Sequence, residues 1–184
     1  MKHIAGVDEV GRGCLAGPVI ASAVILKKHI PGLKDSKKLS PPQRDKLSAL
    51  IIQNSFYSIG SASEQEIDEI NILQASLLAM KRAIVKLKKK PAIVLIDGNK
   101  IPEIKNYKLK SVIKGDQKIP SISAASIIAK VTRDKMITNL GKKFKGYYWD
   151  QNNGYGTKQH LKAIKNLGIT SQHRKTFSPI NKLK

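Results

Sequence analysis

The chain has 184 residues, of which 34 are Lys or Arg and 13 are Asp or Glu, so its formal net charge is +21. This length suits one domain with a full core, and a single cysteine, Cys14, excludes an internal disulfide. The positive charge favours a polyanionic partner, nucleic acid before lipid. The sequence has no apolar stretch of the length that spans a bilayer, and residues 15–26 lack the cleavage pattern of a signal peptide. We therefore expect a protein of the reducing cytoplasm in which Cys14 packs as a small buried residue.

The first half of the chain alternates between strand and helix patterns. Apolar residues predict strands over 4–9 and 19–26, joined through the turn Gly11-Arg12-Gly13. A capping box, Ser-Pro-Pro-Gln, starts a helix over residues 40–53. The β-forming residues of the segment 56–61 then predict a third, short strand.

The second half begins with the longest amphipathic helix. Ser63 and Glu66 form a capping box, and apolar residues at steps of three and four extend the helix to the lysines before Pro91. After it, the patterns predict strands over 92–97 and 108–114 and a largely buried helix over 121–140. Short helices are expected to begin near Thr157 and Thr170. This order predicts a mixed sheet with helices on both faces.

Four acids stand where predicted strands or glycine turns end: Asp8, Glu9, Asp97 and Asp116. Carboxyl ends of buried strands open the clefts of α/β folds, so these side chains are expected to converge. Like charges about 4 Å apart repel by about 4 kcal/mol at an effective dielectric constant near 20, so such a cluster must hold protons or divalent cations. Oxygen ligands without His or Cys favour Mg²⁺ or Mn²⁺, and two such ions would clamp a phosphodiester during hydrolysis. Acidic site and basic surface together predict a nuclease.

Each acid also has a simpler interpretation. Asp97 precedes a glycine and Asp116 follows one, as turn residues commonly do. Asp8 and Glu9 are neighbours, and neighbouring residues of a strand face opposite sides of the sheet. Either the strand ends between them, or Glu9 contributes through its backbone carbonyl or a water. The sequence leaves these alternatives open.

Further residues could bind a nucleic acid. The Gly11-Arg12-Gly13 turn lets the backbone approach a ligand closely, although a plain turn explains it equally well. Ser36 and Lys37 offer hydroxyl and ammonium donors for phosphate, or belong to a solvated loop. Tyr155, between two glycines, could stack on a sugar or base, or anchor its loop.

Together these motifs resemble one known family, ribonuclease HII, the bacterial type 2 ribonuclease H. The matching segments occur in order along most of the chain: residues 6–13 (GVDEVGRG), 35–39 (DSKKL), 96–98 (IDG), 114–116 (KGD), 122–134 (ISAASIIAKVTRD) and 154–157 (GYGT) with His160. Two positions depart from the pattern. Asn152-Asn153 stands where many relatives carry His-Lys, and Thr176 stands where Ser is usual.

The resemblance implies an α/β, ribonuclease H-like fold with a five-stranded mixed sheet flanked by helices. It implies a single domain over 1–184, in which about 141–184 form a helical extension beside the active site. The expected enzyme is a monomer that cuts 5′ to a ribonucleotide in RNA/DNA hybrids or in duplex DNA, leaving 3′-hydroxyl and 5′-phosphate ends.

By the same resemblance, the four acids bind two catalytic Mg²⁺ or Mn²⁺ ions. Gly11, Arg12 and Gly13 recognise the 2′-hydroxyl, Tyr155 stacks on the adjoining sugar, and Lys37 and Lys130 are further candidates for phosphate contacts. Two other functions stay open. A non-catalytic basic RNA-binding protein would bind without cutting, and another ribonuclease H-like nuclease, such as a junction resolvase, would cut without requiring a 2′-hydroxyl.

Overall fold

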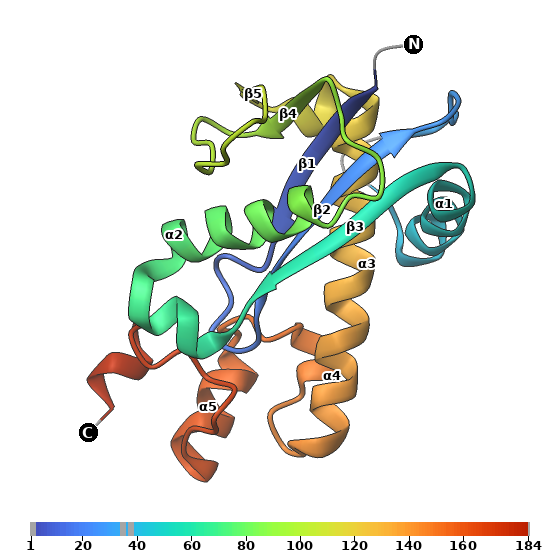
Figure 1. Cartoon of the computed structure of the whole chain (residues 1–184). Coiled ribbons are helices and arrows are strands. Elements are labelled where there is room, and N and C mark those ends of the chain that lie inside the picture. The colour runs from blue at the N-terminus through green and yellow to red at the C-terminus, as the bar shows by residue number, and fades with distance from the viewer. Residues whose placement is uncertain (1–2, 34–35, 37–38, 184) are drawn as a thin grey trace.

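The structure is a computed structural model that describes residues 3–33, 36 and 39–183, and its centre is a five-stranded mixed sheet (Figure 1). The strand order is β3-β2-β1-β4-β5. The pairs β1–β2 and β2–β3 are antiparallel, while β1–β4 and β4–β5 are parallel. The mixed sheet predicted from the sequence is confirmed, with strands at Ile4–Val10, Val19–Leu26, Ser55–Ala62, Ile93–Asp97 and Leu109–Val112.

Helices cover both faces of this sheet. In Figure 1, α2 (Glu64–Val85) crosses one face, α3 (Pro120–Lys143) runs along the other, and α1 (Pro41–Gln53) lies near α3. Both predicted capping boxes are present, at Ser40 and Ser63. None of the helices in the described part of the chain has the length and apolar character needed to cross a membrane.

The alternation of strand residues assigns each side chain to a face. Ala5 and Val7 of β1 belong to the core beneath α2. Gly6 lies on the opposite face, where a Cβ atom would stand 2.1 Å from the backbone carbonyl carbon of Ser121. A glycine is therefore what lets the start of α3 approach β1, and it places Asp8, two residues further along the same face, against this helix.

The chain after α3 folds around Trp149. This part contains two short helices, α4 (Trp149–Asn152) and α5 (Lys158–Leu167), and the turn η3 (Ile180–Lys182). Another helical turn, η2 (Gly115–Gln117), precedes α3. Trp149 is fully buried in a core of its own that also contains Leu15 and Ala16 from the β1–β2 connection. The carboxyl-terminal part is thereby packed against the loop that follows β1.

The sequence anticipated only part of this region. Thr157 caps α5 as predicted, because its hydroxyl accepts the His160 N–H. The helix expected near Thr170 is wrong: the Thr170 N–H and hydroxyl both bond to Nδ1 of His173, and His173 forms a β-bridge with Ala16. Pairing with another part of the chain replaces the local helix.

Two buried histidines have their tautomers set by these bonds. Nδ1 of His160 donates to the Tyr155 carbonyl at 2.8 Å, so its Nε2 accepts the Trp149 indole N–H at 2.9 Å. Nδ1 of His173 accepts the Thr170 N–H, so its Nε2 hydrogen points to Nε2 of His160 at 3.2 Å. Both rings are neutral. Burial, and then the neighbouring His160, lower the pKa of His173 to about 4.

Gly6→Ala is expected to lower the free energy of unfolding by at least about 2 kcal/mol, because backbone atoms of α3 occupy the space of the new methyl group. Gly13→Ala is the control, since no atom lies within 4 Å of its Cβ position. Urea unfolding followed by circular dichroism measures both. Equal stability of the two variants would contradict this account of the β1–α3 contact.

Acidification is expected to destabilise the protein between pH 6.5 and 4. In this range an unfolded chain protonates His173 while the folded chain keeps it neutral, so protons favour unfolding. The melting temperature should fall by several degrees over this range and fall less in His173→Asn. His29→Gln, at an exposed position, should behave like the unmodified chain. A His173→Asn protein with an unchanged pH dependence would refute the role of this ring.

Candidate active site

A cavity of about 360 Å³ opens where β1 and β4 end. It gathers all the candidate residues that lie in the described part of the chain. Lys37 is outside the described residues. The lining consists of Asp8, Glu9, Val10, Gly11, Arg12, Gly13, Ser36, Asp97, Asp116, Ser126, Lys130 and Tyr155.

Asp8 and Asp97 are neighbours across the sheet. Val7 pairs with Ile96 in the parallel β1–β4 ladder, so the two acids come next on adjacent strands. Asp8 is 7% exposed, and burial raises its pKa well above the ordinary value, with the charges of Glu9 and Asp97 adding to the effect. Each carboxylate accepts one backbone N–H, Asp8 from Glu9 at 2.7 Å and Asp97 from Gly115 at 2.6 Å.

Glu9 approaches the cavity from the other face of the sheet. The strand does not end between Asp8 and Glu9 but continues to Val10, so the two side chains diverge. Glu9 also lines a small cavity of about 140 Å³ beside α2. Burial raises the pKa of Glu9, while Arg12, whose Nη1 lies 3.2 Å from Oε1, opposes this rise. Glu9 and Asp8 therefore line the same cavity from opposite faces of the sheet, Glu9 from the α2 side and Asp8 from the α3 side.

Asp116 reaches the cavity through the short connection between β5 and α3. Lys114 adopts a left-handed conformation, with φ of 55°, and the turn η2 follows it. The Gly115 N–H that begins this turn is the donor to Asp97. This bond ties the turn that carries Asp116 to the end of β4.

The donor chemistry of the site fits a divalent cation. Four carboxylates line one cavity, and burial, followed by the charges of Glu9 and Asp97, raises the pKa of Asp8. Hard oxygen donors of this kind suit Mg²⁺ or Mn²⁺. Among the residues that the structure describes, no three acidic, histidine or cysteine side chains are gathered closely enough to hold an ion as they stand. The ligand types are present, but they are not yet collected around one point.

Ser126 is a site residue that the sequence analysis did not single out. Its hydroxyl hydrogen-bonds Asp8 and lies 2.9 Å from the Ser36 hydroxyl, so it links α3 to the loop that carries Ser36. Lys130 follows one helical turn later, and its Nζ is 3.0 Å from Asp134. The spacing of four residues from Ser126 to Lys130 was the available signal, because it places both on one face of a helix.

Tyr155 lies at the mouth of the cavity and is 40% exposed. Burial of its hydroxyl, together with a contact to the Cys14 thiol, raises its pKa. Asn152 is turned inward: its side chain donates to the Tyr147 carbonyl and accepts the Gly154 N–H. Asn152 therefore supports the loop of Tyr155 rather than facing a ligand.

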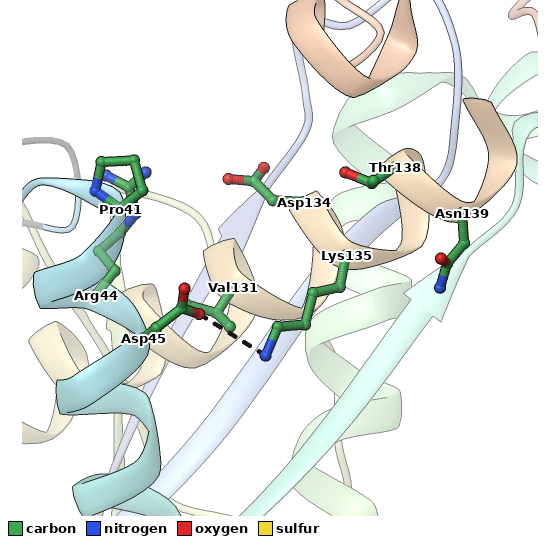
Figure 2. Close-up of a pocket in the computed structure, with 8 residues that line it drawn as sticks. All are labelled: Pro41, Arg44, Asp45, Val131, Asp134, Lys135, Thr138 and Asn139. Carbon is green, nitrogen blue, oxygen red and sulfur yellow. Dashed lines mark ion pairs between the residues drawn. The ribbon is translucent and has the colours of Figure 1, made fainter. Parts of the chain in front are cut away.

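A second cavity, of about 300 Å³, lies between α1 and α3 (Figure 2). Its basic side chains already have partners. Lys135 pairs with Asp45 at 3.7 Å, as the dashed line in Figure 2 marks, and Arg44 donates to the carbonyls of Ser36 and Leu39. We place the chemistry in the acidic cavity for this reason.

Sequence comparison agrees with the geometry. The family model described as Ribonuclease HII matches residues 5–180. Among curated relatives, ribonuclease HII of Pelagibacter ubique is 68% identical over 185 residues, and the alignment covers the full length of both chains.

Solved structures share the fold. Ribonuclease H2 of Pyrococcus horikoshii superposes with a TM-score of 0.81 at 30% identity, covering 98% of this chain and 96% of the other. The ribonuclease HII that was solved in complex with PCNA from Archaeoglobus fulgidus has a TM-score of 0.83 at 28% identity, with 95% of both chains covered. The chain therefore belongs to the ribonuclease HII family, has its ribonuclease H-like fold, and is a metal-dependent endonuclease of the ribonuclease H type.

Proposed function

We propose that the chain hydrolyses the phosphodiester on the 5′ side of a ribonucleotide, in RNA/DNA hybrids and in duplex DNA with embedded ribonucleotides, leaving 3′-hydroxyl and 5′-phosphate ends. The observation that carries the proposal is the single cavity in which the four acids meet the Gly11-Arg12-Gly13 turn and Tyr155. A protein that only bound RNA would gain nothing from four carboxylates in one cavity, which repel phosphate.

Asp8, Glu9, Asp97 and Asp116 are the residues that would hold two divalent ions, Mg²⁺ or Mn²⁺. When bound, such ions polarise the scissile phosphate, activate a water and stabilise the leaving oxygen. The protein contributes the alignment: β1 and β4 fix two carboxylates side by side, and the Gly115 N–H keeps one Asp97 oxygen oriented. Ordered ligands lower the cost of bringing metal and phosphate together.

Selection of a ribonucleotide needs a contact to its 2′-hydroxyl, the one group that DNA lacks. We assign this contact to Gly11, Arg12 and Gly13. No atom lies within 4 Å of the Cβ position of Gly13, so its backbone is open to a ligand, and the Arg12 side chain is 50% exposed. Tyr155 would stack on the adjoining sugar, while Ser36, Lys37 and Lys130 would contact phosphate.

We also propose that residues 1–184 act as one domain and as a cytoplasmic monomer, with 141–184 as an extension beside the cavity. Hydrogen bonds from the Leu15 and Ala16 N–H groups to the Gly154 carbonyl support this arrangement. They join the loop after β1 to the loop of Tyr155. The net charge of +21 supports a nucleic acid duplex as the partner.

The deciding assay uses duplex DNA with one embedded ribonucleotide, with Mg²⁺ or Mn²⁺ and with EDTA. Cleavage on the 5′ side of the ribonucleotide that EDTA abolishes is the expected result. An all-DNA duplex and a duplex with a 2′-O-methyl group at the same position should stay intact. Cleavage of the all-DNA duplex would favour a nuclease of resolvase type, and binding without cleavage would favour a non-catalytic protein.

Asp8→Asn and Asp97→Asn should each lower kcat by about a thousandfold, because each removes one negative charge from the proposed metal ligands. The control is Asp150→Asn, an exposed acid on α4 outside the cavity. Single-turnover cleavage with saturating enzyme measures the rate. Full activity of either cavity variant would overturn the assignment.

Tyr155→Ala should weaken binding of the ribonucleotide duplex by about 1 to 3 kcal/mol, the usual value of one aromatic stacking contact. Tyr155→Phe keeps the ring and should retain most of the affinity. Fluorescence anisotropy in EDTA compares the dissociation constants. If the two variants bind alike, stacking is not what Tyr155 supplies.

A further inference from the structure

Two arginines, Arg133 and Arg174, are fully buried directly behind the Gly11-Arg12-Gly13 turn. A buried guanidinium is costly unless its donors are bonded. Burial and the charge of Arg133 together lower the pKa of Arg174 to about 10, against the opposing effects of Cys14 and Glu64. Two cations held close together in a protein interior need a specific reason.

Arg174 binds the turn itself. Its Nη1 donates to the Arg12 carbonyl at 2.8 Å, and its Nη2 donates to the Gly11 carbonyl at 2.6 Å. Nε and Nη2 both donate to the Gly17 carbonyl, at 3.0 and 2.8 Å. One planar group thus holds both ends of the loop that joins β1 to β2.

Arg133 holds the same loop from α3. Its Nε and Nη2 donate to the carbonyls of Pro18 and Ala16, at 3.0 and 2.9 Å, and its Nη1 donates to the Asn153 carbonyl at 2.9 Å. A Cβ atom on Gly11 would stand 2.1 Å from Nε of Arg133. The glycine is required for this approach, and the third bond extends the network to the segment before Tyr155.

These bonds also fix where the N–H groups of the turn point. In a trans peptide the carbonyl and the N–H of the next residue point in opposite directions. Because the Gly11 and Arg12 carbonyls point at Arg174, the N–H groups of Arg12 and Gly13 point away from it. The turn lines the acidic cavity, so its donors are presented toward a ligand rather than toward the core.

We propose that Arg174 and Arg133 are positioning residues for ribonucleotide selection. They hold five carbonyls of the loop inward, so that the turn offers its N–H groups to the 2′-hydroxyl; these carbonyls belong to Gly11, Arg12, Ala16, Gly17 and Pro18. This inference rests on the proposed function, which assigns that contact to the turn. Neither arginine touches the substrate. The pair acts through the backbone of the loop alone.

Glu64 is a buried acid whose charge acts on both arginines. Its carboxyl is buried, and burial raises its pKa. The positive charges of Arg174 and Arg133 oppose this rise. Among the described residues, no hydrogen-bond partner is found for its Oε1 atom. Its Oε1 atom therefore does not compete for the donors that bind the carbonyls.

The test is Arg174→Lys, which keeps the charge but cannot reach the carbonyls of Gly11, Arg12 and Gly17 together. We expect the KM for the single-ribonucleotide duplex to rise by about tenfold to a hundredfold, since a small misplacement of a positioned group has that effect. Affinity for an all-DNA duplex, which depends on surface charge, should stay unchanged. Arg82→Lys is the matched control, because Arg82 also donates to a backbone carbonyl, that of Ser61, far from the turn.

A purely structural role would lower the fraction of active enzyme, and hence kcat, at an unaltered KM. A folded Arg174→Lys protein with the unmodified KM would overturn the inference. If the unmodified chain itself does not cleave the ribonucleotide duplex, the proposed function has failed instead. The two failures are therefore distinguishable.

A measurement on the unmodified chain covers the case in which the variant does not fold. In EDTA, the ribonucleotide duplex should shift the Nε–Hε resonances of Arg133 and Arg174, because the carbonyls that they bind move with the turn. An all-DNA duplex of the same sequence should not. Equal shifts with both duplexes, or none with either, would contradict the inference.

Discussion

The pairing of β1 with β4 is the constraint on which the site depends. It holds Asp8 and Asp97 beside each other although their charges repel, and it does so with backbone hydrogen bonds that the charge of the side chains does not alter. Gly6 lets α3 press against the same strand, which brings Ser126 to Asp8. The carboxylates are thus positioned by the framework of the fold, and their mutual repulsion is what favours a cation between them.

The loop after β1 is held by a different kind of interaction. The β1–β2 pairing ends at Val10, before the Gly11-Arg12-Gly13 turn. The buried guanidinium group of Arg174 binds the Gly11 and Arg12 carbonyls instead, and that of Arg133 binds carbonyls at the far end of the loop. His160 extends this polar network by binding the Tyr155 carbonyl. The proposed substrate contacts of the turn and of Tyr155 therefore depend on buried polar side chains, whose donors are matched to backbone carbonyls that would otherwise lack partners.

Short sequence motifs predicted helix starts correctly where the interactions that fix those starts are between neighbouring residues. The capping boxes at Ser40 and Ser63 and the cap at Thr157 predicted three helix starts, because each satisfies its own N–H groups within one turn. The helix expected at Thr170 did not form, because His173 pairs with Ala16, more than 150 positions away. A bond over that separation leaves no trace in a local pattern.

The sequence by itself determined the sheet, its covering helices and the acids at the strand ends, because hydrophobic periodicity and glycine turns are properties of neighbouring residues. Its motifs also indicated the family. Only the tertiary structure decided that Glu9 enters the site from the α2 face, that Ser126 bonds Asp8, and that Arg133 and Arg174 lie buried behind the turn. An arginine in a basic chain looks like one more surface charge, and only the packing of distant segments can reveal that its partners are backbone carbonyls.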